Sequence, residues 1–137
     1  MANRSGYRGY VSSREFGGIR MPVPVQVMVL RDYCQRRGLL FKLHVNENSF
    51  PHSYLVLESL VRNLDGFEGL LVGSMFMLPR RAERRTAIYR EFFRDGLELH
   101  LVMEEKIVRG PADVDEVEEI LSVYETLRHC PTEIPAA

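Results

Sequence analysis

Residues 70–79 read Leu-Leu-Val-Gly-Ser-Met-Phe-Met-Leu-Pro, a nearly continuous apolar run that ends at Pro79. An apolar run without polar alternation is typical of a central parallel strand that is covered on both faces. Proline stops such a strand, because it has no N–H to donate to a neighbouring strand. The run therefore predicts the central strand of a parallel sheet.

Strands and helices are expected to alternate around this run. β-Compatible segments predict further strands over 7–11, 39–45 and 97–103. Apolar residues at helical spacing predict four helices, which cover 22–38, 53–65, 82–94 and the segment from 111 onward. Strands that alternate with helices in this way require right-handed crossovers. We therefore expect a three-layer α/β domain with a parallel sheet of four or five strands.

Size and composition are those of one globular domain. The chain has 137 residues, of which 45% are hydrophobic and 27% charged. We expect a single domain over 1–137, with flexible tails at 1–5 and 131–137. The two cysteines, Cys34 and Cys130, form neither a metal-ligand spacing nor a disulfide framework. With no apolar signal-peptide core or membrane span in the sequence, this predicts a cytoplasmic protein.

The charge balance argues against nucleic acid as a partner. The formal net charge is -1 and the isoelectric point is about 6.4. A domain that holds duplex DNA usually carries a clear basic excess. Arginines are concentrated over 80–94, but acidic residues interrupt them, and a solvated helix face explains the pattern equally well.

The last predicted helix suggests self-association. It has a broad apolar stripe, and its other face is acidic, opposite in charge to the helix over 82–94. Pairing of these two helices could occur within one chain or between subunits. We expect a homo-oligomer, a dimer or a tetramer, because self-complementary surfaces usually produce closed assemblies.

A ligand site is expected beyond the carboxyl ends of the strands, where loops and helix N-termini converge. The Ser12-Ser13-Arg14 segment follows the first strand and offers hydroxyls, backbone amides and a guanidinium. These groups suit a phosphate or a carboxylate, although serines in a loop often only turn the chain. The residues assigned to this anion site are Arg8, Ser12, Ser13, Arg14, Ser74 and Arg80.

Proton transfer is assigned to Tyr10, Glu47 and Glu104, which follow or end strands at the same edge. A carboxyl group can act as a general acid or base at neutral pH if burial raises its pKa. Glu104 is preferred to Glu105, because successive strand residues point in opposite directions. The alternative, that these carboxylates simply face water, stays open. Because the sequence lacks a glycine-rich phosphate loop and zinc-ligand spacings, we expect no metal and no cofactor.

Three segments resemble motifs of the serine recombinase catalytic domain of the resolvase and invertase type: residues 10–13, 33–34 and 76–80. The resemblance implies a resolvase-like fold, similar in layout to flavodoxin, with Ser12 at the position of the family's nucleophile. Tyr10 replaces the motif's first arginine, and Phe76-Met77 replaces its Asp-Arg pair. Phosphodiester cleavage needs several cations around the developing charge. We therefore expect no recombinase activity.

A second resemblance, over most of the chain, is to the sporadic carbohydrate cluster proteins of bacteria. These short proteins are found beside genes for unusual sugars and surface polysaccharides. The matching segments are 6–14, 31–34, 74–79 and 129–130. The resemblance implies a role in carbohydrate biosynthesis and assigns no reaction.

Together these observations predict a small enzyme that binds a phosphorylated or nucleotide-linked sugar. No motif requires a redox cofactor, so the expected chemistry is proton transfer by an isomerase, epimerase or lyase. Two alternatives stay open. The protein could be a non-catalytic partner that regulates another pathway enzyme, or a degenerate recombinase relative that still binds DNA.

Overall fold

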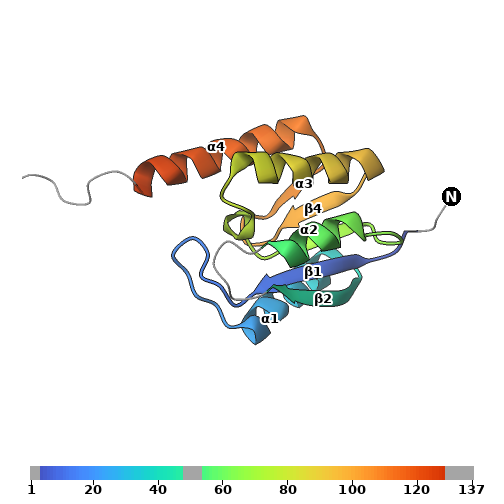
Figure 1. Ribbon diagram of the computed structural model, residues 1–137. Coiled ribbons are helices and arrows are strands. Elements are labelled where there is room, and N and C mark those ends of the chain that lie inside the picture. The colour runs from blue at the N-terminus through green and yellow to red at the C-terminus, as the bar shows by residue number, and fades with distance from the viewer. Residues whose placement is uncertain (1–3, 48–53, 129–137) are drawn as a thin grey trace, which may run out of the picture.

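The computed structural model describes residues 4–47 and 54–128, which form an α/β fold around one five-stranded sheet (Figure 1). The strands are β1 (Tyr7–Ser12), β2 (Phe41–Glu47), β3 (Gly69–Val72), β4 (Glu98–Leu101) and β5 (Lys106–Val108). The helices are α1 (Val23–Arg37), α2 (Leu55–Arg62), α3 (Ala82–Asp95), α4 (Pro111–Arg128) and the short 3-10 helix η1 (Met75–Met77). The strand order is β2-β1-β3-β4-β5.

The sheet is parallel except at one edge. Strands β1 to β4 run in the same direction, whereas β5 pairs antiparallel with β4. The expectation that a fifth strand would also be parallel is therefore wrong. A tight turn joins β4 to β5, with Glu105 at a φ of 53° and its N–H bonded to the carbonyl of Val102. Such a turn permits only antiparallel pairing, because a parallel neighbour needs a long crossover.

The apolar run at 70–79 contains less strand than expected. Strand β3 ends at Val72, and η1 follows from Met75 to Met77. The Ser74 hydroxyl accepts a hydrogen bond from the N–H of Phe76 and so caps η1. The chain therefore turns at Ser74, and the second half of the run packs as a helical turn beyond the sheet.

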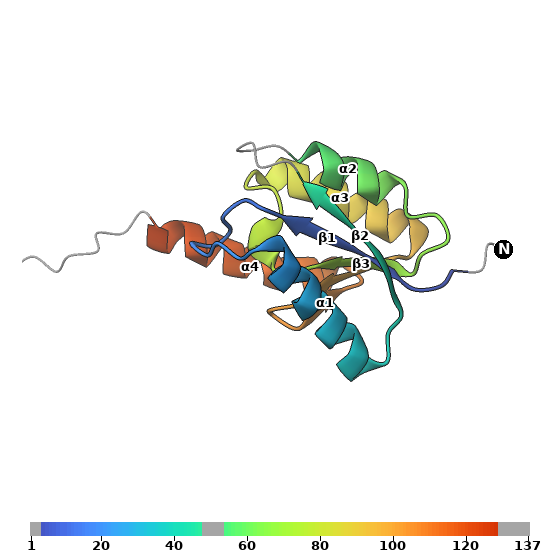
Figure 2. The ribbon, with the colours of Figure 1, turned by 90° about the horizontal axis from the view of Figure 1, so that it is seen from below.

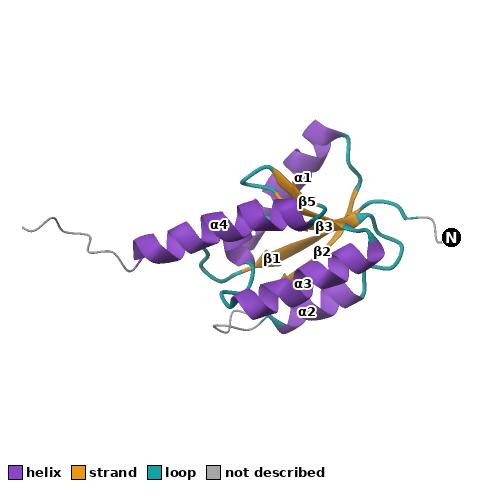
Figure 3. Cartoon of the chain, turned by 90° about the horizontal axis from the view of Figure 1, so that it is seen from above, coloured by secondary structure: helices purple, strands orange, loops and turns teal. Residues whose placement is uncertain are grey.

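Two buried apolar clusters lie on opposite faces of the sheet. Leu99 and Leu101 of β4 belong to the cluster that includes residues of α2, α3 and α4. Leu71 of β3 and Tyr33 of α1 belong to the other. Figure 2 shows α1 in front of the strands, and Figure 3 shows the opposite face with α2, α3 and α4. Because strand side chains alternate in direction, the central strands β1 and β3 contribute buried residues to both clusters.

Helix α1 and helix α3 both end at a glycine in the left-handed conformation. Gly38 has a φ of 67° and Gly96 a φ of 66°. Each glycine N–H bonds to carbonyls of the last helical turn, which is how such caps stop a helix. These two ends agree with the sequence prediction.

Some predictions cannot be compared with the structure. Ser53, the first residue of the helix predicted over 53–65, lies outside the described residues, as do Cys130, the tail at 131–137 and the first three residues. Among the described residues, no helix has the length and apolar character to cross a bilayer.

Candidate ligand-binding site

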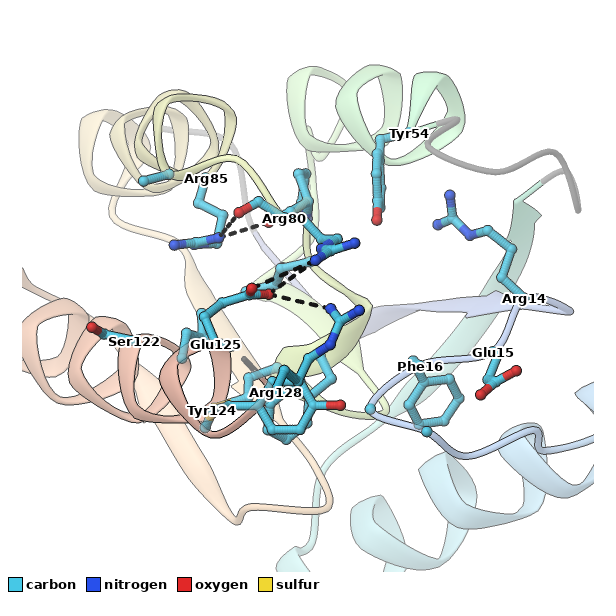
Figure 4. Close-up of a pocket in the computed structure, with 18 of the residues that line it drawn as sticks. Arg14, Glu15, Phe16, Tyr54, Arg80, Arg85, Ser122, Tyr124, Glu125 and Arg128 are labelled. Carbon is cyan, nitrogen blue, oxygen red and sulfur yellow. Dashed lines mark hydrogen bonds and ion pairs between the residues drawn. The ribbon is translucent and has the colours of Figure 1, made fainter. Parts of the chain in front are cut away.

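A cavity of about 1130 Å³ lies at the carboxyl edge of the sheet (Figure 4). Its wall comes from the loop after β1, from η1 and the segment that follows it, and from α4. It contains the arginines Arg14, Arg20, Arg80, Arg85 and Arg128. It also contains the carboxylates Glu15, Glu118 and Glu125, together with aromatic rings. The cavity lies where an open parallel sheet usually binds its ligand.

Arg14 lies in the cavity wall, against Tyr10 and Tyr54. Its Nη2 atom donates to the Tyr10 hydroxyl at 3.2 Å, and its guanidinium lies 4.2 Å from the centre of the Tyr54 ring. Its backbone N–H donates to the Ser12 hydroxyl oxygen. Stacking on an aromatic face leaves the edges of a guanidinium able to bind an anion. Ser13, beside it, is exposed and also lines the cavity.

Ser12 is buried beneath this wall. Its side chain is almost inaccessible, and it borders a space of only about 20 Å³, between Phe16, Tyr54 and Phe76. Gln26 of α1 fixes the strand end by accepting from the Ser12 N–H at 3.1 Å and donating to the Ser12 carbonyl at 2.6 Å. In this arrangement, the hydroxyl at the recombinase nucleophile position does not face the large cavity.

Tyr10 and Glu47 form a buried pair next to Arg14. The Tyr10 hydroxyl donates to Oε1 of Glu47 at 2.9 Å. Burial, and then the adjacent Glu47 carboxylate, raise the pKa of Tyr10 far above its ordinary value, so Tyr10 stays protonated at neutral pH. Glu47 also accepts the N–H groups of Val56 and Leu57, and so caps the start of α2. Proton transfer by this pair stays a prediction.

Glu104 has a comparable contact with η1. It accepts from the Ser74 hydroxyl at 2.7 Å and from the Met75 N–H at 2.9 Å. Neither Ser74 nor Glu104 is part of the large cavity's wall. Glu105, in the same turn but with a φ of 53°, is directed elsewhere and pairs with Arg36 at 3.3 Å.

Arg80 lies in the cavity wall. Its Nη2 atom is 3.4 Å from Oε1 of Glu125, and Nη1 of Arg128 is 3.5 Å from the same atom. Figure 4 shows both arginines directed at Glu125. Arg8 lies elsewhere: it is the half-buried second residue of β1, with its guanidinium 5.5 Å from the centre of the Phe67 ring. The cavity thus brings together Ser13, Arg14 and Arg80.

Arg85 fixes the chain at the cavity wall. It forms two hydrogen bonds of 2.8 Å with the carboxylate of Glu118 and donates to the carbonyls of Pro79 and Arg80. Desolvation acts to raise the pKa of Glu118, but hydrogen bonds from Arg85 and Tyr89 outweigh it and lower that pKa below its ordinary value. The pair between α3 and α4 therefore holds the backbone next to Arg80 in place.

The comparisons with known proteins establish the fold alone. No family model and no curated protein matches the chain. Among solved structures, it is similar to the N-terminal catalytic domain of TP901-1 integrase, with a TM-score of 0.62 and 15% identity over 88% of this chain and 95% of that chain. This agrees with the resolvase-like fold implied by the recombinase motifs. None of the comparisons supports the resemblance to the sporadic carbohydrate cluster proteins.

Proposed function

We propose that the protein binds a phosphorylated ligand, a nucleotide-linked or phosphorylated sugar, in the cavity at the carboxyl edge. The observation that carries the proposal is the convergence of Ser13, Arg14 and Arg80 on one cavity. Guanidinium groups bind phosphate oxygens through paired, charge-assisted hydrogen bonds. Arginines in the wall outnumber carboxylates, so the cavity favours an anion.

Aromatic rings supply the second part of the ligand preference. Phe76 and Tyr124 lie in the wall with their ring centres 4.6 Å apart. Such a pair offers an apolar surface against which a base or a sugar ring can stack. The cavity volume, about 1130 Å³, is slightly above the usual range of small-ligand pockets, so a nucleotide-sized molecule fits better than a lone phosphate.

The proposed chemistry is proton transfer of the isomerase, epimerase or lyase type. Tyr10 is its first candidate, because its hydroxyl contacts both Arg14 and Glu47. In such a step the Tyr10 hydroxyl would accept a proton from the ligand while it passes its own hydrogen to the Glu47 carboxylate, so that Tyr10 ends neutral and Glu47 ends protonated. Glu104 lies behind η1 and would act there only by positioning Ser74 and Met75.

Replacing Arg14 by glutamine is expected to weaken the binding of a nucleotide sugar such as UDP-glucose by about tenfold or more, because a charged hydrogen bond to phosphate is lost. Isothermal titration calorimetry measures this change. Arg90→Gln is the matched control, since Arg90 is exposed on α3 and does not line the cavity. Equal affinities for wild type and Arg14→Gln would remove the anion site from the proposal.

A nucleic-acid phosphate is the second candidate ligand. The fold is shared with the catalytic domain of an integrase, and the same arginines could contact a phosphodiester backbone. Duplex binding that weakens steeply with salt, and that Arg14→Gln reduces, would favour this candidate. Sugar-nucleotide binding without duplex binding would favour the first. A stable complex with another enzyme, formed without either ligand, would instead support a regulatory partner.

A cytoplasmic homo-oligomer completes the proposal. Charge pairing to α4 occurs within the chain: Arg85 of α3 pairs with Glu118, and Arg80, which precedes α3, pairs with Glu125. The support for self-association is therefore apolar: Val123 and Leu127 of α4 are 54% and 63% exposed. A second copy that packs on α4 would cover them.

A further inference from the structure

A second cavity, of about 620 Å³, lies at the opposite edge of the sheet. Its wall includes Tyr7 and Glu98, the first residues of β1 and β4, and Arg109, which follows the antiparallel β5. Arg37 reaches it from the last turn of α1. The cavity therefore lies at the amino edge, on the face that α1 covers, and shares no residue with the site proposed above.

The two faces of β4 differ sharply in chemistry. Leu99 and Leu101 point to the cluster of α2, α3 and α4 and are fully buried. Glu98 and His100 alternate with them and point to the other face, where His100 is only 2% exposed. Burying a histidine and a carboxylate side by side is costly unless each polar atom has a partner.

Every side-chain nitrogen and oxygen of this pair has a partner. His100 is 2.6 Å from the Tyr33 hydroxyl through Nδ1 and 3.0 Å from Oε1 of Glu98 through Nε2. Because the carboxylate only accepts, Nε2 carries the proton and Nδ1 accepts from Tyr33. The Tyr7 hydroxyl donates to Oε1 of Glu98 at 2.6 Å, and Arg109 donates to Oε2. We call this hydrogen-bonded group the floor of the cavity; its members are Tyr7, Tyr33, Glu98, His100 and Arg109.

Two arginines at this cavity remain outside the floor's network. Arg109 neutralises Glu98, but neither Arg4 nor Arg37 has a hydrogen-bond or ion-pair partner within residues 4–47 and 54–128. The Arg37 guanidinium lies over the Tyr33 ring, 4.6 Å from its centre. Glu68, also in the wall, accepts the N–H of Gly6. The wall therefore has one more positive charge than negative charge.

We propose that the amino-edge cavity is a second binding site, which holds a small oxyanion, a phosphate or carboxylate group, between Arg4 and Arg37 above the Tyr7–Glu98–His100 floor. Stacking on Tyr33 preorganises Arg37, so little side-chain freedom is lost on binding. The saturated floor offers no competing acceptor, because both oxygen atoms of Glu98 already accept hydrogen bonds. The site is independent of the proposed function at the carboxyl edge.

The test titrates the full-length protein with inorganic phosphate and, separately, with malonate at constant ionic strength. The NMR signals of the His100 imidazole nitrogens report on the floor of this cavity. We expect a saturable shift with at least one probe, and the probe that causes it identifies the group as phosphate or carboxylate. Arg37→Gln should weaken that binding about tenfold or more, because a charged hydrogen bond is lost. Arg4→Gln should weaken it in the same direction.

Arg14→Gln tests whether this site and the site at the carboxyl edge bind their ligands independently. It should leave the His100 titration unchanged, whereas Arg37→Gln should leave nucleotide-sugar binding unchanged. Thermal unfolding of each variant checks that it is folded, and Arg4→Gln covers the case in which loss of the Tyr33 contact unfolds Arg37→Gln. His100 signals that do not move with either probe, or that move equally in wild type and in a folded Arg37→Gln or Arg4→Gln variant, would overturn the proposal.

Discussion

Replacing Arg85 by alanine is expected to lower the free energy of unfolding by about 2–3 kcal/mol. The same change at an exposed arginine on a helix usually alters the free energy of unfolding very little. Arg85 is 9% exposed, and its guanidinium bonds the Glu118 carboxylate and the carbonyls of Pro79 and Arg80. Truncation leaves a half-buried carboxylate and two carbonyls without their charged donor. Urea unfolding followed by circular dichroism measures the loss.

Arg90 supplies the control for this prediction. It lies on the same helix, is exposed, and its change to alanine should alter the free energy of unfolding by no more than about 0.5 kcal/mol. A double-mutant cycle of Arg85→Ala with Glu118→Ala should give a coupling of about 1 kcal/mol or more. Additive single effects would show that the pair contributes no stability of its own.

The sequence predicts most helix ends and the central strand, because these depend on local chemistry. Gly38 and Gly96 stop helices through a backbone conformation that glycine adopts at low cost. Local chemistry does not predict where β4 ends and β5 begins. The segment 97–103 reads as one alternating strand, but the chain leaves it after Leu101 and turns back through Glu105. A preference for strand structure does not specify where a strand ends.

The carboxyl-edge rule predicts Ser13, Arg14 and Arg80, because each directly follows a strand or its loop. It misses Tyr124 and Arg128, which α4 brings to the cavity from the far end of the chain. Their place depends on how α4 packs, and no local pattern specifies it. Arg8 lies away from the carboxyl edge because it is the second residue of β1.

Gln26 and the amino-edge cluster lie on buried faces of a helix and a strand, so a rule about strand ends does not predict them. Gln26 lies on the same helical face as Leu30 and Tyr33, so its spacing already indicates a buried amide. In the same way, alternation places Glu98 and His100 on the face opposite Leu99. Both signals are present in the sequence. They are overlooked when polar residues are considered only at strand ends.

Acid should destabilise the protein through Glu98. Desolvation acts to raise its pKa, but hydrogen bonds from Tyr7, His100 and Arg109 outweigh this and lower the pKa from 4.5 to about 2. A carboxyl whose pKa is lower in the folded state binds protons more weakly there than in the unfolded chain. Its stabilising effect is complete above about pH 4.5 and is lost as the pH falls through about 2. His100 adds acid sensitivity at higher pH, because burial lowers its pKa below 6.5.

Glu98→Gln isolates the contribution of this carboxylate. At pH 7 we expect the variant to be less stable by about 2–3 kcal/mol, since each unit of pKa difference is worth about 1.4 kcal/mol and the partial exposure of the carboxylate reduces the full effect. The gap between wild type and variant should shrink as the pH falls from about 4.5 to about 2, because the wild-type carboxylate becomes protonated there. Urea unfolding at a series of pH values measures both curves. Parallel curves over that range would mean that Glu98 titrates alike in the folded and unfolded chains, and the charged floor of the amino-edge cavity would then lack its organising group.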